Sequence, residues 1–271
     1  MNHNELYQLL ELPEEVVQAL DAYGNSKQNT FSVTLDDLTE HDELIQTLDK
    51  LIADYVGEDP EGIKILWEEL NIAVQSYEKY RQKGIPTHIF ADTMKFCTRF
   101  LSEYHKTHGC YRYVWGWWFP RQLSLREFRI GALEYELNDE KCISIHIPSD
   151  ADLSPQSVMQ SLAGFKAFCR QYYPEWEKME MQCESWMLSP ALSNVLRTDS
   201  NILAFQKLFD INETDYESMA VLDWVFPGFD KVSEELPEET SLQRNMKKYL
   251  LEGNKIGWSK GSLHVIKRRE T

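Results

Sequence analysis

The stretch "KCISIHIPSDADLSPQSVMQSLAGFKAF", residues 141–168, decides the fold class that we expect for the second half of the chain. Isoleucine occupies every second position at Ile143, Ile145 and Ile147, and this alternation is the pattern of a strand. The following "LSPQS" places Ser154 at a helix cap and Pro155 just inside the helix. The stretch therefore predicts a strand that leads directly into a helix.

Such a junction directs several free backbone N–H groups toward one point, which is a natural site for an anion. Asp150 and Asp152 lie in the connecting loop, and their carboxylates would repel an anion unless they point away or pair with a cation. A phosphate-binding site and a plain capped turn both remain open.

Composition limits the class of protein. The chain has 271 residues, 42% of them hydrophobic, which suffices for one large domain or two. Its formal net charge of −16 disfavours binding to nucleic acid or to an anionic membrane surface. Five widely spaced cysteines form no C-x-x-C pair and indicate a reduced chain. No signal peptide or membrane span is evident, so we expect a cytoplasmic protein.

Apolar residues follow a helical period up to about residue 108. The three predicted stripes comprise Leu44, Leu48, Leu51 and Tyr55; then Ile63, Trp67, Leu70, Val74 and Tyr77; then Phe90, Met94, Cys97, Leu101 and Tyr104. The period is mixed from residue 109. We therefore predict an α+β protein with a helical domain over 1–108 and a domain over 109–271 that contains a mixed sheet flanked by helices.

In the second domain, an aromatic-rich segment, "CYRYVWGWWFPRQL", begins at residue 110. Strands are predicted at 127–137, 141–148, 180–188 and 218–228, and helical segments at about 155–171, 200–209 and 241–253. Ser241 is the expected cap of the last helix, and "KIGW" and "SLHVIK" are expected to form a closing hairpin around "SKG".

The order of these elements resembles that of the GNAT acyltransferases, which use acetyl-CoA to acylate amines. The whole chain resembles the bacterial group that joins a helical N-acyltransferase N-terminal domain to a GNAT-like C-terminal domain. The stretches that carry the resemblance are "HIPSDADLSPQSVMQSL", "CESWMLSPALSNVL" and "SNILAFQKLF". The resemblance implies acetyl-CoA or another acyl-CoA as co-substrate, and a small-molecule amine or a peptide as acceptor.

The resemblance also implies a position for the acyl-CoA pyrophosphate, between the strand at 141–148 and the next helix. The matching residues are Ile147, Ser154, Gln156 and Ser157, with Asn201 as a further cofactor contact or a helix cap. The glycines of the family motif are absent here. Phe205 stands near the place of the tyrosine that often acts as the general acid, and it cannot donate a proton.

Two residues are candidate catalytic groups. The resemblance places Glu184 on the strand that diverges from its neighbour, where a partly buried carboxylate is the predicted general base toward the amine. His146 ends the preceding strand and can act as a base or hold the substrate. A structural role, in hydrogen bonds or ion pairs, stays open for both.

Substrate contacts are expected from Glu134, which shares a strand face with Glu136 where either can bind a cationic amine. Trp117 and Trp186 are expected to offer aromatic surface for a ring or acyl chain. Core packing or solvent exposure is the alternative for each. His105, His108 and Cys110 lack a second ligand pair, so no metal site is predicted. A homodimer is conceivable, and the alternative to an enzyme is a binding or regulatory module that kept the scaffold without transfer chemistry.

Overall fold

The computed structural model describes residues 1–26, 35 and 59–264. The first predicted stripe, Leu44 to Tyr55, lies outside these residues. The chain divides into two compact units: Met1–Ile130 together with Arg170–Pro174, and Gly131–Cys169 together with the chain from Glu175 on. The structure thus places the main boundary after Ile130 instead of after residue 108.

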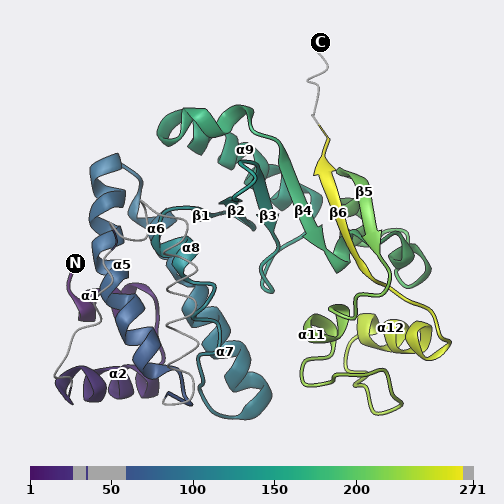
Figure 1. The fold of residues 1–271 in the computed structure, drawn as a ribbon, viewed down its shortest axis with the longest axis horizontal. Helices are drawn as coiled ribbons and strands as arrows, with labels where there is room; N and C mark the ends of the chain where they lie inside the picture. Colours follow the sequence, from purple (N-terminus) through teal and green to yellow (C-terminus); the bar gives the residue numbers. More distant parts are fainter. Residues whose placement is uncertain (27–34, 36–58, 265–271) are drawn as a thin grey trace. The chain divides into compact units, whose positions relative to one another are not determined.

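The first unit is helical (Figure 1). Its elements among the described residues are α1 (His3–Leu9), α2 (Glu14–Ser26), α5 (Ile63–Lys83), α6 (Thr87–Met94), α7 (Phe96–His108), α8 (Pro120–Leu123) and β1 (Glu127–Ile130). Asp59 accepts a hydrogen bond from the Ile65 N–H at 3.0 Å and so satisfies an amide in the first turn of α5. Gly84, in the left-handed region, ends α5.

The second predicted stripe is confirmed as one helix, α5, but the third is divided between two helices, α6 and α7. The chain leaves helical geometry at Lys95, where ψ is −1°. Four of the five stripe residues are buried nevertheless: Phe90, Met94, Cys97 and Leu101. The apolar period identified the buried face correctly, and it did not reveal the break between the helices.

The second unit contains the sheet. Its elements are β2 (Leu133–Leu137), β3 (Ile143–His146), α9 (Pro155–Tyr172), β4 (Met181–Ser185), α10 (Asn201–Gln206), β5 (Phe209–Asp215), α11 (Val221–Val225), α12 (Ser241–Leu251) and β6 (Trp258–Leu263), with the 3-10 helices η1 (Pro174–Lys178), η2 (Trp186–Leu188) and η3 (Pro190–Asn194). These strands lie in the order β2-β3-β4-β6-β5 (Figure 1). β3 and β4 are parallel, and the other neighbouring pairs are antiparallel.

Helix α9 packs on one face of this sheet. The rings of Tyr135 on β2 and Phe165 on α9 stack with centroids 4.0 Å apart and an interplanar angle of 4°. The Tyr135 hydroxyl lies 2.8 Å from the Ser161 hydroxyl, so the polar end of this buried tyrosine has a partner. A second apolar cluster joins η2 and η3 to α11 and α12, through residues such as Trp186, Leu192, Phe226 and Met246.

Several predicted elements are wrong in type or extent. Residues 127–137 form two strands, β1 and β2, because Gly131 turns the chain with φ of +65°. The predicted strand at 180–188 ends at Ser185, whose side chain accepts from the Met187 N–H and starts η2. The predicted strand at 218–228 contains the helix α11, and the predicted closing hairpin is one strand, β6, which runs through "SKG".

Three further observations concern the second half of the chain. The aromatic-rich segment that begins at residue 110 contains no strand up to Leu123, which ends the short helix α8. The edge strand β5 was not predicted. Thr240, instead of Ser241, caps α12 and forms a capping box with Gln243. No helix among the described residues has the length and apolar character needed to span a bilayer.

Candidate active site

The predicted catalytic residues lie on one polar face of the sheet in the second unit. Residues paired across neighbouring strands project to the same face of a sheet. The ladder pairs Glu134 with His146, Glu136 with Ser144, Ser144 with Gln182, and Glu184 with Lys260. His146 and Glu184 therefore share one face, on adjacent strands. Tyr135, which stacks on α9, projects to the opposite face.

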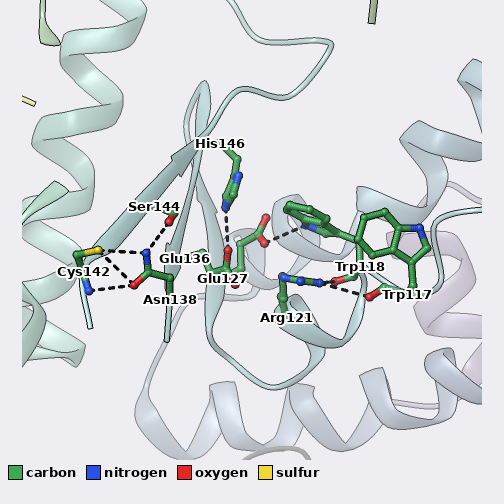
Figure 2. Close-up of polar contacts among 9 residues, drawn as sticks. All are labelled: Trp117, Trp118, Arg121, Glu127, Glu136, Asn138, Cys142, Ser144 and His146. Carbon is green, nitrogen blue, oxygen red and sulfur yellow. Dashed lines mark hydrogen bonds and ion pairs between the residues drawn. The ribbon is translucent and has the colours of Figure 1, made fainter. Parts of the chain in front are cut away.

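His146 ends β3 and forms a hydrogen bond with Glu136 of β2, with 2.9 Å between Nε2 and Oε2 (Figure 2). The contact is partly shielded from water, because the side chains are only 26% and 11% exposed. Glu134, directly opposite His146 in the ladder, is also buried. The solvent-facing alternative for Glu134 is therefore wrong. The structure brings two carboxylates and one imidazole to the end of β3.

Glu184 lies in a different environment. Its carboxylate contacts the Lys260 ammonium of β6 at 3.2 Å, and Glu140 approaches the same ammonium at 3.5 Å. The hydrogen bond to Glu184 is the main reason why the pKa of Lys260 is raised. The Glu184 side chain is 53% exposed, so this ion pair lies in contact with water.

The loop between β3 and α9 contains the residues expected to contact the cofactor. Asp152 accepts hydrogen bonds from the Ser154 N–H and from the Ser154 hydroxyl, each at 2.9 Å. The hydrogen bond from the Ser154 backbone is the main cause that lowers the pKa of Asp152. The Ser154 oxygen in turn accepts weakly from the Ser157 N–H at 3.4 Å. Two backbone donors at this helix start thus have partners within the loop itself.

Two other predicted cofactor contacts differ in exposure: Ile147 is half-buried and Gln156 is exposed. Asn201 is the first residue of α10 and is exposed, and the cap is Ser200, which accepts from the Ile202 N–H at 3.2 Å. The helix-cap alternative for Asn201 is therefore wrong. Contacts of Ile147, Ser154, Gln156, Ser157 and Asn201 with a cofactor stay predictions.

The strands β3 and β4 separate next to this loop. Their parallel ladder pairs Ile143 with Met181 and Ser144 with Gln182, and it includes no later residue of either strand. β4 continues to pair with β6 as far as Ser185. Ile145 and His146 of β3 therefore lie beyond the last paired residues. This is the divergence of strands that the resemblance predicts.

The first unit holds the predicted aromatic contact. Trp117 is 42% exposed, and its ring lies 5.4 Å from that of Trp115 and 5.4 Å from that of Trp118. The Arg121 guanidinium lies 4.3 Å from the centroid of Trp118, whose Nε1 donates to Glu127 at 3.2 Å (Figure 2). These contacts hold Trp118 in place beside the exposed Trp117 ring.

Trp186, the other predicted aromatic contact, is only 4% exposed and belongs to the apolar cluster of η2, η3, α11 and α12. It therefore packs in the core of the second unit, and it does not share the face of Glu184, because the strand ends before it. The sequence did not indicate that Glu136 contacts His146 or that Lys260 contacts Glu184. Their partners depend on strand register, which local patterns do not specify.

Comparison with known proteins accounts for both units. A family model described as N-acyltransferase N-terminal domain matches residues 1–125, and one described as GNAT-like C-terminal domain matches residues 127–263. No curated protein of known function matches the chain.

Solved acyltransferase structures share the fold. One, in complex with decanoyl-CoA and teicoplanin, has a TM-score of 0.75 at 20% identity, covering 96% of this chain and 86% of that chain. Another, with CoA and 10C-teicoplanin, has a TM-score of 0.76 at 19% identity, covering 97% and 87%. A mutant with octanoyl-CoA has a TM-score of 0.75 at 18% identity, covering 96% and 86%. The chain belongs to the family that joins an N-acyltransferase N-terminal domain to a GNAT-like C-terminal domain.

Proposed function

We propose that the protein transfers an acyl group from acyl-CoA to an amine, and that His146 is the general base. The observation that carries this proposal is the His146–Glu136 pair at the end of β3, where β3 and β4 separate. Family membership supports acyl transfer, and the solved structures of similar fold hold decanoyl-CoA, octanoyl-CoA or CoA. One of them also holds teicoplanin, so a peptide-like acceptor with a small amine is a reasonable class.

In the proposed reaction, the ammonium form of the substrate first releases one proton to solvent. The neutral amine nitrogen then attacks the thioester carbonyl carbon while the imidazole of His146 accepts the second proton from the nitrogen. The tetrahedral intermediate then collapses, the carbon–sulfur bond breaks, and the CoA thiolate leaves. The thiolate takes up the proton from the imidazolium, so the amide and free CoA are the products. No general acid is needed besides the protonated base, which accommodates the absence of a tyrosine near Phe205.

Glu184 is the alternative base, and the geometry favours His146 over it. When His146 accepts a proton, the Glu136 carboxylate stabilises the imidazolium that forms. When Glu184 accepts a proton, its attraction to the Lys260 ammonium is lost. The first protonation gains an ion pair and the second gives one up.

The acceptor is expected to be cationic before it reacts. The polar face carries Glu134, Glu136 and Glu184, and the chain has a formal net charge of −16. Such a field raises the local concentration of a cation. Glu134 is proposed as the residue that contacts the ammonium form of the substrate.

A melting-shift screen tests the donor half of this proposal. Acetyl-CoA, octanoyl-CoA, decanoyl-CoA and free CoA are added in excess, and we expect at least one to stabilise the protein by about 2.7 kcal/mol at 100 times its Kd. The donor that binds is then incubated with teicoplanin, spermidine or benzylamine, and the amide product is detected by mass spectrometry. If no CoA species shifts the melting temperature, the acyltransferase proposal fails. Donor binding without transfer to any amine would favour the binding-module alternative.

The base is tested separately with His146→Gln and Glu184→Gln. We expect the histidine variant to bind the donor as the parent does and to lose at least about 100-fold in kcat. A comparable loss in the Glu184 variant alone would assign the base to Glu184 instead.

A further inference from the structure

Glu136 of β2 and His146 of β3 are diagonal neighbours, and their long side chains meet across the two strands. The residue directly opposite His146 is Glu134, and the residue opposite Glu136 is Ser144, two positions before His146. The imidazole nevertheless contacts Glu136, the diagonal neighbour, at 2.9 Å. Diagonal neighbours on one sheet face lie within reach of long side chains such as these.

A hydrogen-bond network at the β2–β3 turn fixes this register (Figure 2). The side-chain amide of Asn138 donates to the Ser144 hydroxyl at 3.0 Å, and its oxygen accepts from the Cys142 N–H at 3.1 Å. The same amide group contacts the Cys142 sulfur. The partner of Glu136 in the ladder, Ser144, is thus held from the turn side, and slippage of β2 against β3 would break these contacts.

When the Glu136 carboxylate is ionised it can only accept hydrogen bonds, and the Nε2 atom of His146 then carries the proton in their contact. The neutral imidazole then has its lone pair on Nδ1. The Glu136 side chain is 11% exposed, and in such shielded surroundings the electrostatic preference for one tautomer and one ring orientation is stronger than in water.

We propose that Glu136 is a positioning residue that fixes the Nε2–H tautomer and the ring orientation of His146, so that Nδ1 is the atom that accepts the proton. This inference rests on the proposed function, because it assumes that His146 is the base. Glu136 contacts neither substrate in this account and acts only through His146.

The test compares Glu136→Gln, Glu136→Asp, His146→Gln and the control Glu217→Gln, which removes one carboxylate, paired with Lys255, from the same unit. Kinetics are measured with the donor and the amine that give the highest turnover in the screen above. We expect Glu136→Gln to lose about 10²- to 10⁴-fold in kcat, with the donor KM and the melting shift by donor unchanged. We expect the kcat of Glu136→Asp to be at least about tenfold higher than that of Glu136→Gln, and the control to keep the parental kcat.

The tautomer is read directly by ¹⁵N NMR at pH 8, with His146→Gln used to assign the resonances of His146. We expect an Nε2–H signal for His146 in the parent and a mixture of tautomers in Glu136→Gln. This measurement on the parent protein needs only the His146→Gln variant to fold, and it stands even where Glu136→Gln does not.

Three outcomes would overturn the inference. If Glu136→Gln keeps the parental kcat while His146→Gln is inactive, His146 is the base without help from Glu136, and only this inference fails. If His146→Gln keeps the parental kcat, the proposed base fails as well. Carboxylates and imidazoles also bind metal ions, so if EDTA abolishes turnover and Zn²⁺ restores it, Glu136 is a metal ligand and not a positioning residue.

Discussion

Ser144 of β3 and Gln182 of β4 are the last residues that the two parallel strands pair with each other. Gln182 also pairs with Ser262 of β6, and β4 continues in that partnership through Ser185. A divergence of this kind exposes backbone groups of β3 that a fully paired strand would bury in its ladder. In a thioester transferase, a backbone N–H at such a place can polarise the carbonyl that the amine attacks.

The ion pair between Glu184 and Lys260 is expected to contribute little to stability. The two side chains are 53% and 29% exposed, and solvent screens such pairs. A double-mutant cycle with Glu184→Gln and Lys260→Met, followed by urea unfolding, should give a coupling free energy of about 0.2–1 kcal/mol. A coupling above about 2 kcal/mol would show that the pair is far better shielded than its exposure indicates.

Gly257 is expected to tolerate no side chain, unlike Gly253. Both have positive φ, +77° and +84°, but a Cβ at Gly257 would lie 2.5 Å from the Asp215 carbonyl oxygen, and one at Gly253 meets nothing within 4 Å. Gly253→Ala should therefore cost only about 1–2 kcal/mol for its backbone conformation. Gly257→Ala should cost about 2–5 kcal/mol, because the contact between β5 and β6 must also shift. Equal costs in chemical denaturation would contradict this account.

Local patterns in the sequence predicted the long elements. Helices α5 and α9 have an extended apolar period and clear ends, such as Gly84 and the "LSP" at Ser154, so their positions follow from local chemistry alone. The short elements were harder. β5 is mostly exposed and carries Asp210, Asn212 and Glu213, so no alternation of apolar residues marks it as a strand. It is held in the sheet by its pairing with β6.

The same distinction applies to the candidate site. His146 and Glu184 could be identified because each lies on a recognisable strand, His146 at the end of β3 and Glu184 within β4. Glu136 as the partner of His146 could not, because the partner depends on which residues of β2 and β3 face each other. Trp186 was misplaced for a related reason: the side chain of Ser185 ends the strand and starts a 3-10 turn, which carries the tryptophan into the core.

Alkaline pH should destabilise the protein partly through Cys97. Burial raises the pKa of this thiol to about 12. Because the folded-state pKa lies above that of the unfolded chain, the unfolded state loses its proton first as the pH rises above about 9, and the free energy of unfolding falls by ~1.4 kcal/mol per pH unit. The contribution is complete below pH 9 and disappears as the pH approaches 12.

The measurement is urea unfolding at pH 8 and pH 10.5 for the parent, Cys97→Ala and the control Cys110→Ala, whose thiol is exposed. Between these pH values, Cys97→Ala should lose about 2 kcal/mol less stability than the parent, and the control should lose as much as the parent. An identical pH dependence in all three proteins would show that Cys97 is not protected from ionisation in the folded state.

Trp117 is expected to bind the acyl chain of a long-chain donor. Its ring is 42% exposed and stacks on Trp115, so it presents an apolar face that folding has left in contact with water. Trp117→Ala should weaken the binding of decanoyl-CoA by about 1 kcal/mol, roughly fivefold in Kd, and leave that of acetyl-CoA unchanged, because an acetyl group offers little apolar surface to a tryptophan ring. Isothermal titration calorimetry with both thioesters measures this difference.

Tyr216→Ala, which removes an aromatic ring that is 44% exposed in the second unit, serves as the control and should bind both as the parent does. An equal loss for both thioesters in Trp117→Ala would mean that the ring contacts the CoA moiety or supports the fold, and the assignment to the acyl chain would be wrong.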